Sequence, residues 1–388
     1  MSGSPPGRLR LAAYTDYSYR REGDAVYGER AFVLFLSGLA GSVDQLLILG
    51  RLDPRPGRSH YRLPAGVQFV PLPHYESLLA PFRAIASMLR SLRRFWRALD
   101  EVDAVWLLGP YVHSLAFVGL AALRRRRIVL GVRQDTPRYV RSRHPNRRWT
   151  HWAASLLDLA WRALSRRYPI VVVGPDLARR YAHTPRLLTI SVSLVHEAEV
   201  TSLEAAEGRR YDGELRVMSV GRLEPEKNPL LLADVLAKLR ERDPRWRLTV
   251  CGEGPMEAEL ARRLEEVGAR DSADLRGYVP VDGGLADLYR TSHALLHVSH
   301  TEGLPAVLFE AFAAGLPVVA TAVGGVGEAV GGAAALVPAG DAGAAAAALR
   351  RIADDPGQRR ELIAAGLAEA REHTIERECA RLAEFLAG

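Results

Sequence analysis

Two glutamates in the stretch from Leu295 to Val330 stand where a carboxylate is costly. Glu310 lies in the second turn of a segment that is apolar on almost every side, which predicts a helix buried all round. A lone buried carboxylate is unfavourable unless it is hydrogen-bonded or paired, so Glu310 is expected to meet a fixed partner or a ligand. Glu302 lies in the loop before this helix, and both are suited to accept hydrogen bonds from sugar hydroxyls beside a phosphate. The alternative is that Glu310 pairs with a core arginine and Glu302 only caps the helix.

The loop that leads into this helix has the composition of an anion site. It contains Gly303, which allows close backbone approach, then Leu304, then Pro305 at the expected first helical position, where no N–H is needed. Gly315 and Pro317 are expected to end the helix. The run before the loop has the pattern of a strand. The helix N-terminus is therefore expected at the carboxyl end of a strand, where backbone amides and the helix dipole favour an anion.

Arg222 and Lys227 provide a second set of candidates. They follow Gly221 in a turn between an apolar strand pattern and an apolar-periodic helix. The chain has 52 lysines and arginines, but Lys227 and Lys238 are its only lysines, which makes a lysine in this loop notable. A planar guanidinium and a compact ammonium can bind a diphosphate from two sides and neutralise a departing phosphate. The alternative is that both are solvated loop cations.

The elements that must position these residues alternate between short apolar strands and helical patterns, which predicts an α/β fold with parallel sheet. The polar segment 196–213 separates two such series and marks the expected domain boundary. The last stretch, from Gly357 to Leu386, is expected to be helical and amphipathic. The expected strands are 9–14, 46–49, 67–70, 104–108, 128–132 and 170–173, then 215–220, 247–251, 294–298, 318–320 and 334–337.

Composition narrows the class of protein further. The chain of 388 residues is long enough for two domains, and Cys251 and Cys379 cannot form a disulfide framework, which fits a reducing cytoplasm. The polar leader from Met1 to Gly7 is not a secretory signal, and no apolar run is long enough to predict a transmembrane helix. No Asp-x-Asp pair and no cluster with metal-ligand spacing occurs, so no catalytic metal and no cofactor are expected.

The net charge of +7 is divided unevenly. Residues 1–200 contain 30 lysines and arginines against 15 aspartates and glutamates, whereas residues 201–388 contain 22 against 30. Two halves of opposite net charge suggest two domains with different partners. A basic half suits anionic surfaces such as membrane lipid, nucleic acid or an acidic substrate.

Taken together, the motifs of the second half resemble the retaining family 4 glycosyltransferases. The resemblance covers roughly residues 215–352 in order and spacing. It implies the GT-B fold, with two Rossmann-like domains whose parallel sheets face an inter-domain cleft: an acceptor domain over 1–200, a nucleotide-sugar domain over 201–368, and a C-terminal helix over 369–388 that packs back on the first domain. The motifs are Ser-Val-Gly-Arg-Leu-Glu-Pro-Glu-Lys-Asn from Ser219, Gly-Glu-Gly-Pro from Gly252, Gly-Tyr-Val from Gly277, Glu-Gly-Leu-Pro-Ala-Val-Leu-Phe-Glu-Ala from Glu302, and Gly-Leu-Pro-Val-Val-Ala-Thr from Gly315.

The resemblance also implies roles for individual residues. Arg222 and Lys227, beside Gly221, would bind the donor diphosphate, and Glu310 would accept hydrogen bonds from the ribose. Glu302, with the backbone after it from Gly303 to Pro305, would orient the donor sugar, so that Glu302, Arg222 and Lys227 form the catalytic set. The base would lie along Gly277, Tyr278 and Val279. Transfer would then retain the anomeric configuration, with the leaving phosphate itself helping to take the acceptor proton.

The first half departs from the family pattern. The usual glycine pair after the first strand is reduced to Gly28, and a histidine that is common after a mid-domain strand is replaced by Arg133, Gln134 and Asp135. Gln134 could keep a hydrogen bond to a sugar and Asp135 could accept a proton. His113 is the nearest alternative histidine, although an ordinary loop histidine is the simpler interpretation.

Two segments of the basic half combine arginines with apolar or aromatic residues. The segment from Phe82 to Leu99 has helical periodicity with one apolar face, which is typical of an interfacial helix. The segment from Arg138 to Trp152 mixes arginines with a tyrosine and two tryptophans. Both suggest peripheral contact with the inner face of a membrane. The alternative is that each helix packs its apolar face in the domain core and leaves its arginines in solvent.

The sequence therefore predicts a cytoplasmic enzyme that moves a sugar from a nucleotide-diphosphate donor to a glycan, lipid-linked or small-molecule acceptor. Three alternatives remain open: a nucleotide-sugar epimerase of the same fold, a non-catalytic subunit, and a nucleic-acid-binding protein. The chain contains no recognised nucleic-acid motif, so no nucleic-acid partner is expected.

Overall fold

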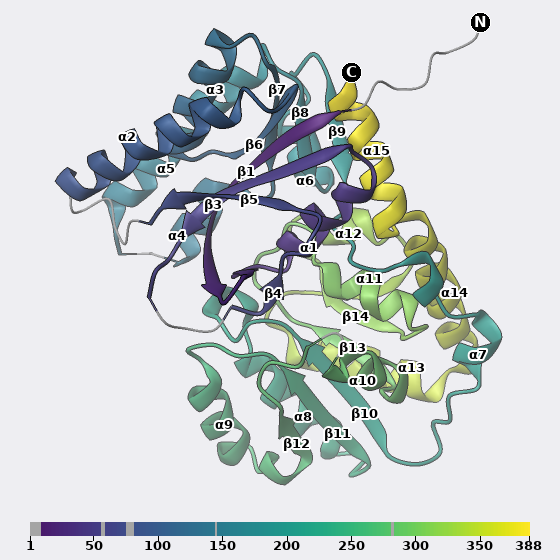
Figure 1. Ribbon diagram of the computed structural model, residues 1–388. Coiled ribbons are helices and arrows are strands. Elements are labelled where there is room, and N and C mark those ends of the chain that lie inside the picture. The colour runs from purple at the N-terminus through teal and green to yellow at the C-terminus, as the bar shows by residue number, and fades with distance from the viewer. Residues whose placement is uncertain (1–8, 56–58, 75–80, 144–145, 281–282) are drawn as a thin grey trace, which may run out of the picture. The chain divides into compact units, whose positions relative to one another are not determined.

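The computed structural model describes residues 9–55, 59–74, 81–143, 146–280 and 283–388, and the side chains of all of these except 81–85 and 142–143. The leader expected from Met1 to Gly7 lies outside this range. The chain forms two compact units, one from Met1–Val192 with Ile375–Gly388 and one from Ser193–Thr374 (Figure 1). The sequence analysis had placed the boundaries after residues 200 and 368.

The first unit contains a mixed sheet that is mostly parallel. In the described part of the chain the strand order is β4-β2-β1-β6-β7-β8-β9, with β3 paired to β1 and β5 paired to β3; only the β1–β2 and β2–β4 pairings are antiparallel. Its strands are β1 (Arg10–Glu22), β2 (Ala25–Gly28), β3 (Gln45–Leu52), β4 (Tyr61–Arg62), β5 (Gln68–Pro73), β6 (Ala104–Gly109), β7 (Arg127–Val132), β8 (Ile170–Val173) and β9 (Leu187–Ile190). Its helices are α1 (Phe32–Gly38), η1 (Leu39–Gly41), α2 (Pro81–Ala98), α3 (Val112–Leu123), α4 (Thr136–Arg143), α5 (Arg148–Ser165), α6 (Pro175–Arg180) and α15 (Ile375–Ala387).

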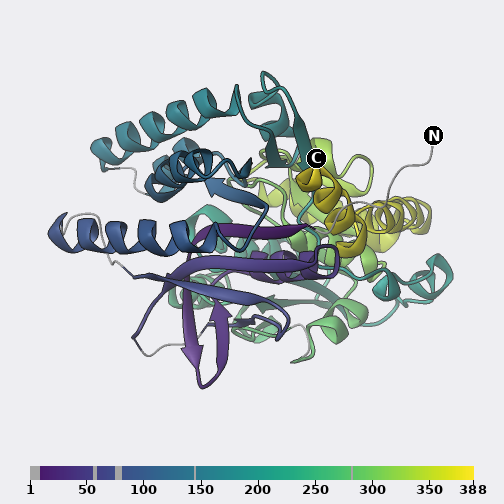
Figure 2. The same cartoon turned by 45° about the horizontal axis from the view of Figure 1, so that its top comes forward.

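Helices cover both faces of this sheet because its central strands are apolar on both sides. Phe95 of α2, Phe117 of α3 and Trp161 of α5 pack on one face, where α2, α3 and α5 lie side by side (Figure 2). On the other face, Phe32 of α1 meets Trp106 of β6, with ring centroids 6.1 Å apart, and α15 contacts β6 and β9.

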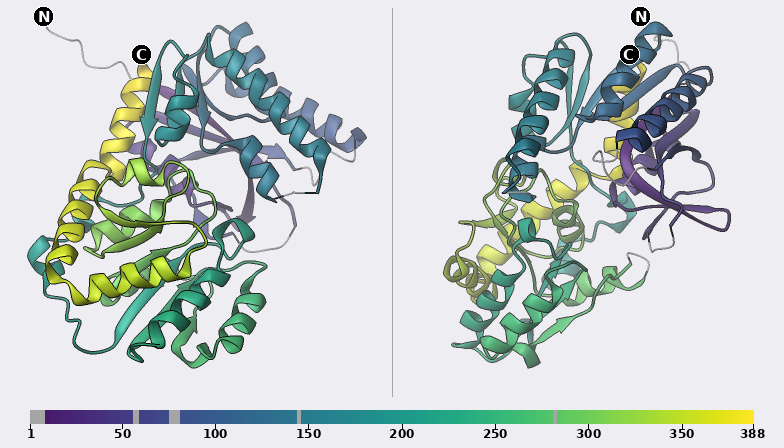
Figure 3. Two further views of the ribbon diagram at one scale, coloured as in Figure 1. Left: turned by 180° about the vertical axis from the view of Figure 1, so that it is seen from behind. Right: turned by 90° about the vertical axis from the view of Figure 1, so that its left-hand side faces the viewer.

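The second unit contains an all-parallel sheet in the order β12-β11-β10-β13-β14-β15. Helices α8, α9 and α13 lie side by side over one face (Figure 3), and α10 and α11 contact strands of the same sheet. Its strands are β10 (Leu215–Val220), β11 (Trp246–Cys251), β12 (Ala273–Leu275), β13 (Ala294–His297), β14 (Val318–Thr321) and β15 (Ala334–Val337). Its helices are η2 (Glu197–Glu199), α7 (Leu203–Glu207), η3 (Pro225–Lys227), α8 (Leu230–Arg240), α9 (Glu257–Glu266), η4 (Arg270–Ser272), α10 (Leu285–Thr291), α11 (Ala306–Ala313), α12 (Val326–Ala329), α13 (Ala342–Asp354) and α14 (Pro356–Glu372).

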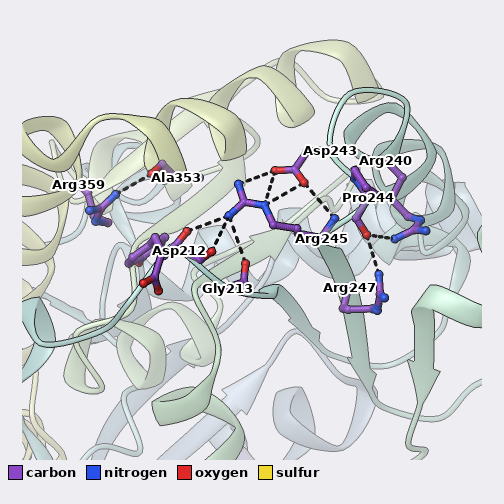
Figure 4. Close-up of polar contacts among 10 residues, drawn as sticks. Asp212, Gly213, Arg240, Asp243, Pro244, Arg245, Arg247, Ala353 and Arg359 are labelled. Atoms are coloured by element: carbon purple, nitrogen blue, oxygen red, sulfur yellow. Dashed lines mark hydrogen bonds and ion pairs between the residues drawn. The ribbon is translucent and has the colours of Figure 1, made fainter.

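The amino ends of β10 and β11 are fixed by Arg245 (Figure 4). Its guanidinium donates to the carbonyls of Tyr211, Asp212 and Gly213 at 3.2–3.3 Å, and to the Asp243 carboxylate at 2.7 Å. The two strands are then paired in continuous register from Leu215–Trp246 to Val220–Cys251. Because the register is continuous, the two strands end side by side at Val220 and Cys251, and the loops that follow them start next to each other.

The C-terminal stretch from residue 357 to 386 is helical, as expected, but it is divided into two helices. It consists of α14 in the second unit and α15 in the first, separated at His373 and Thr374. Leu382 and Leu386 of α15 are buried, and the Cys379 thiol lies 3.7 Å from the Phe35 carbonyl. No helix among the described residues is both long and apolar enough to cross a membrane.

Candidate functional site

The strand order of the second unit creates a defined binding position. The first strand of this sheet, β10, has β11 on one side and β13 on the other, so successive connections leave the sheet in opposite directions from this point. In open α/β sheets, ligands bind at the carboxyl ends of the strands beside such a switch point. Lys227 follows β10 and Glu302 follows β13, so the switch point brings these two predicted residues together.

At this point, the Glu302 carboxylate accepts three hydrogen bonds from described residues. Its Oε1 accepts from the Lys227 ammonium, from Ser299 Oγ at 2.6 Å and from His297 Nε2 at 2.9 Å. Burial by itself raises the pKa of this carboxyl, but the Lys227 charge and the His297 hydrogen bond outweigh it and hold the pKa well below its usual range. Glu302 is therefore a buried, ionised and oriented carboxylate.

The loops after β10 and β13 are also joined through their backbones. The His300 amide donates to the Glu226 carbonyl at 2.9 Å. Lys227 ends the short helix η3, and Asn228 after it adopts the left-handed conformation with φ of 52°, which asparagine tolerates better than most residues. This turn aims the Lys227 side chain back toward Glu302.

Arg222 is paired with carboxylates of its own loop. Its guanidinium contacts Glu224 and, at 3.5 Å, Glu226. Glu226 is buried, and that burial together with its hydrogen bond to Glu224 raises its pKa. The Arg222 side chain is 38% exposed, so an incoming phosphate can reach it and compete with these two carboxylates.

Glycines let three loops converge at the same edge. A Cβ on Gly252 would lie 1.8 Å from the Gly221 carbonyl oxygen, so the loops after β10 and β11 approach as closely as they do only because that side chain is absent. The Gly252 amide donates to the Gly277 carbonyl at 2.7 Å, which attaches the loop after β12. Gly277 itself has φ of +63°, and the Tyr278 amide, before Val279, lies 3.4 Å from Glu253 Oε1. A Cβ on Gly221 would meet no heavy atom within 4 Å, so space is open above it.

Glu310 lies on α11, and its partner is a tyrosine. Tyr289 of α10 donates its hydroxyl to Glu310 Oε2 at 2.8 Å. Burial raises the pKa of Glu310, and the Tyr289 hydrogen bond only partly opposes this. The core arginine considered as an alternative partner is not found among the described residues.

The start of α11 is left uncapped by side chains. The helix begins at Ala306, so Pro305 is the N-cap residue and not the first helical residue that the sequence indicated. Pro305 makes no side-chain cap. The alternative that Glu302 caps this helix is therefore wrong, because Glu302 is bonded to Lys227 instead. Gly303 and Leu304 precede the N-cap, so the backbone at this helix start is presented beside the Lys227–Glu302 pair.

The sequence analysis missed four polar residues of this site. His297 and Ser299 orient Glu302, and the Thr321 hydroxyl donates to the Ser299 carbonyl at 2.8 Å. A histidine and a serine two residues apart at the end of an apolar strand were the available signal. Tyr289 gave no signal, because its contact with Glu310 depends on how α10 packs near α11.

The candidates of the first unit are less closely grouped. His113 is buried in the first turn of α3, 5.9 Å from the Phe117 ring, and burial lowers its pKa. Gln134 is exposed after β7. Asp135 accepts from the Arg138 amide at 3.0 Å and from Arg180 at 2.5 Å, which gives it a structural role at the start of α4.

Gly28 ends β2, where it pairs with Tyr19 of β1. A Cβ there would lie 2.5 Å from the Val33 side chain, so this glycine serves close packing against α1. Within the part of the chain that the structure describes, no group of three or more His, Cys, Asp or Glu side chains is placed to hold a metal ion. The absence of a catalytic metal stays a prediction.

Comparisons with known proteins show which sequences and folds the chain resembles. Residues 202–368 match the family model described as glycosyl transferases group 1. Among curated proteins, the chain is 36% identical over 220 residues to a D-inositol 3-phosphate glycosyltransferase of Actinosynnema mirum, which covers 53% of each chain. The chain thus spans about half the length of that relative.

Two solved structures show the fold. Sucrose-phosphate synthase from Thermosynechococcus elongatus superposes with a TM-score of 0.73 at 19% identity, covering 97% of this chain and 98% of that one. Anabaena Alr3699/HepE in complex with UDP gives 0.71 at 17%, covering 98% and 100%. The predicted α/β class and GT-B architecture are confirmed. Within the second unit, residues 202–368 match the glycosyl transferases group 1 family.

Proposed function

We propose that this protein is a glycosyltransferase that takes its sugar from a nucleoside diphosphate donor and retains the anomeric configuration. The observation that carries the proposal is the Lys227–Glu302 pair at the switch point between β10 and β13. A buried carboxylate that three donors orient, beside a lysine, an arginine and an uncapped helix start, supplies both charge for a diphosphate and an acceptor for sugar hydroxyls.

The donor diphosphate would lie over Gly221, where no side chain fills the space. Lys227 and Arg222 would neutralise it, and Arg222 would exchange Glu224 for phosphate oxygens. Glu302 would meet the donor sugar, together with the backbone of Gly303 and Leu304.

The nucleoside would extend toward the loop after β12. Among the described residues, the Glu310 carboxylate accepts one hydrogen bond, at Oε2, so its other oxygen would accept from the ribose. The base would lie along Gly277, Tyr278 and Val279. Because Anabaena Alr3699/HepE was solved with UDP and with UDP-glucose, we propose uridine as the first base to test.

Catalysis would rest on charge stabilisation rather than on a side-chain nucleophile. As the bond from the sugar to the phosphate breaks, negative charge grows on the leaving diphosphate, which Lys227 and Arg222 are placed to stabilise. The leaving phosphate would take the acceptor proton on the same face of the sugar, which gives retention. We propose that no metal ion is required, since the two cations supply the charge.

A transfer assay tests this function. Purified protein is incubated with UDP-, GDP- and ADP-sugars and candidate acceptors, and the anomeric configuration of the product is read by NMR. We expect one nucleotide-sugar to be consumed with retention, and a rate at least about a hundredfold lower for Lys227→Ala. An inverted product would contradict the mechanism, and isomerised donor without transfer would favour an epimerase.

We also propose that the first unit binds a membrane surface, through α5 rather than α2. The side chains of residues 81–85 and 142–145 lie outside the described part, so Phe82 is not placed. Of the rest of α2, Phe95 is buried, Leu92 and Trp96 pack against the core, and Leu89 is exposed. The apolar face of α2 thus serves mainly the core.

Helix α5 has an apolar stripe on its outer side. Ala154, Asp158 and Trp161 face the core, whereas the opposite side carries four exposed large apolar residues at helical spacing. They are Trp149 at 56%, Trp152 at 77%, Leu156 at 68% and Leu159 at 61% exposure. The only acidic residue of α5, Asp158, is bound to Arg180 at 2.5 Å, and arginines stand at both helix ends.

This combination supports contact with an anionic lipid surface. Tryptophans prefer the depth of the headgroups, and nearby arginines are attracted to anionic lipid. A lipid-linked acceptor at the inner face of the membrane is the substrate class that such a location favours.

A further inference from the structure

Arg133 lies at the carboxyl end of β7. It is the first residue after the strand, so it stands at the edge of the first unit where parallel α/β sheets bind ligands. The neighbouring strand β6 ends at Gly109, beside Val132 in the sheet register. The Arg133 side chain is half-buried, and its Nε atom is fully buried.

Aromatic rings hold the Arg133 guanidinium. Its central carbon lies 3.8 Å from the centroid of the Phe32 ring and 5.5 Å from that of Tyr17. Planar stacking of this kind orients the guanidinium while leaving the N–H groups at its edge able to donate.

No carboxylate accompanies this cation in the part of the chain that the structure describes. Its buried Nε has no hydrogen-bond partner, and burial alone lowers the pKa of the group, to about 9, which leaves it charged at neutral pH. By contrast, the partly buried Arg51 pairs with Asp16 at 3.2 Å, and Arg180 pairs with Asp135 and Asp158. A buried cation without an anion is unfavourable, so a ligand that supplies one would bind strongly.

A second arginine and a tyrosine belong to the same edge. Arg30 lies two residues before Phe32 and makes no ion pair among the described residues. Tyr111 lies in the loop after β6, where burial and the Asp16 carboxylate raise its pKa and the Arg30 charge lowers it. The net change of this pKa is upward, so the Tyr111 hydroxyl stays protonated and able to donate. Arginine, tyrosine and aromatic rings together form a typical environment for a phosphate or carboxylate on a sugar.

We propose that Arg133 binds an anionic group, a phosphate or a carboxylate, on the acceptor substrate. The guanidinium donates two parallel hydrogen bonds to that group and so fixes the acceptor by its charged end. The identification of the ligand as the acceptor rests on the proposed glycosyl transfer. The anion site itself consists of residues of the first unit alone.

Calorimetric titration into the full chain tests the site directly. The probes are inorganic phosphate, glucose 6-phosphate, glucuronate and uncharged glucose, and the variants are Arg133→Met and Arg133→Lys. The matched control is Arg126→Met, which removes a half-buried arginine that immediately precedes the same strand. UDP is titrated into every variant.

We expect wild-type protein to bind glucose 6-phosphate or glucuronate in preference to glucose, and the stronger of the two identifies the anion. Arg133→Met should weaken that binding at least about tenfold, and Arg133→Lys should weaken it less, because lysine keeps the charge but not the fork. The anion affinity of Arg126→Met should equal that of the wild type, and the UDP affinity of every variant should be unchanged. Since Arg133→Met removes an unpaired buried charge, its ligand-free Tm should equal or exceed that of the wild type.

Three results would overturn the proposal: no anion binds the wild type, Arg133→Met binds anions as the wild type does, or UDP affinity falls instead. A lower Tm of Arg133→Met with unchanged anion binding would show that Arg133 only stacks on Phe32. Anion binding at Arg133 in a protein that binds no nucleotide would leave this site standing and refute the proposed function.

Discussion

The Glu310 carboxyl group lies in the second unit, where burial raises its pKa. An acid whose pKa is raised on folding holds its proton more tightly in the folded state, so the fold loses stability as pH rises from the ordinary value of 4.5 through the raised one. Glu310→Gln removes this charge and can still accept from Tyr289. We expect the variant to lose less stability between about pH 5 and about pH 8 than the wild type, measured by denaturant titration.

The same substitution should weaken nucleotide binding roughly tenfold or more, since a charged acceptor for ribose hydroxyls is lost. If Glu310 served only the fold, Gln would leave nucleotide affinity intact, and calorimetry would show it.

The Lys227–Glu302 pair has the opposite pH dependence. The pKa of Glu302 is depressed on folding, so its stabilising contribution is complete above the ordinary value of 4.5 and is lost as pH falls through the folded value. Lys227→Ala leaves this carboxylate buried without its cation, and we expect a loss of about 2 kcal/mol in the free energy of unfolding near neutral pH. Lys227→Ala/Glu302→Gln should recover most of that loss. A double variant no more stable than the single one would show that the two side chains are not coupled.

Single residues of the site divide into those the sequence could predict and those it could not. Arg222, Lys227, Glu302 and Glu310 could be found because charged residues in turns or apolar helices are chemically conspicuous. Tyr289 could not, because its contact requires the packing of two helices that are separate in sequence.

At the scale of elements, apolar periodicity predicted the central strands of both sheets, since these are buried on both faces. It missed β2, β4, β9 and β12, which have two to four residues each and too few apolar positions to form a pattern. It also placed the start of the last helix at residue 369 rather than at Ile375, because nothing local shows that the chain leaves one unit for the other at Thr374.

The exposed tryptophans of helix α5 should contribute directly to vesicle binding. Trp149→Ser/Trp152→Ser should weaken sedimentation with vesicles containing anionic phosphatidylglycerol by at least about tenfold, because burying each such side chain is worth about 1.5–3 kcal/mol. The control Leu123→Ser removes a 75% exposed leucine of α3, outside the stripe, and should bind as the wild type does.

Neutral phosphatidylcholine vesicles should bind the wild type poorly, because the flanking arginines then have no anion to meet. Equal binding of the double variant and the wild type would contradict the proposal for α5. Quenching by brominated lipid gives a second readout, since the other tryptophans are buried or packed against the core.

At the scale of the whole molecule, the last helix belongs to the first unit although it follows the second in sequence. Arg127 donates to the Leu386 carbonyl at 3.2 Å, and the Ile375 side chain fills the space above Gly38. Leu382→Ala should therefore destabilise the first unit by about 2–4 kcal/mol. Hydrogen exchange should rise in β6 and β9 and stay unchanged in β10 and β13; a rise confined to the second unit would refute this attachment.

The central claim is that the carboxyl edge of the second unit's sheet binds a nucleoside diphosphate. Calorimetric titration of UDP, GDP and ADP tests it, with Lys227→Ala compared against Lys238→Ala, which removes the chain's other lysine from the exposed side of α8. We expect one nucleotide to bind selectively, Lys227→Ala to weaken it at least about tenfold, and Lys238→Ala to leave it unchanged. Folded wild-type protein that binds none of the three, or equal effects of the two lysine substitutions, would contradict the donor site.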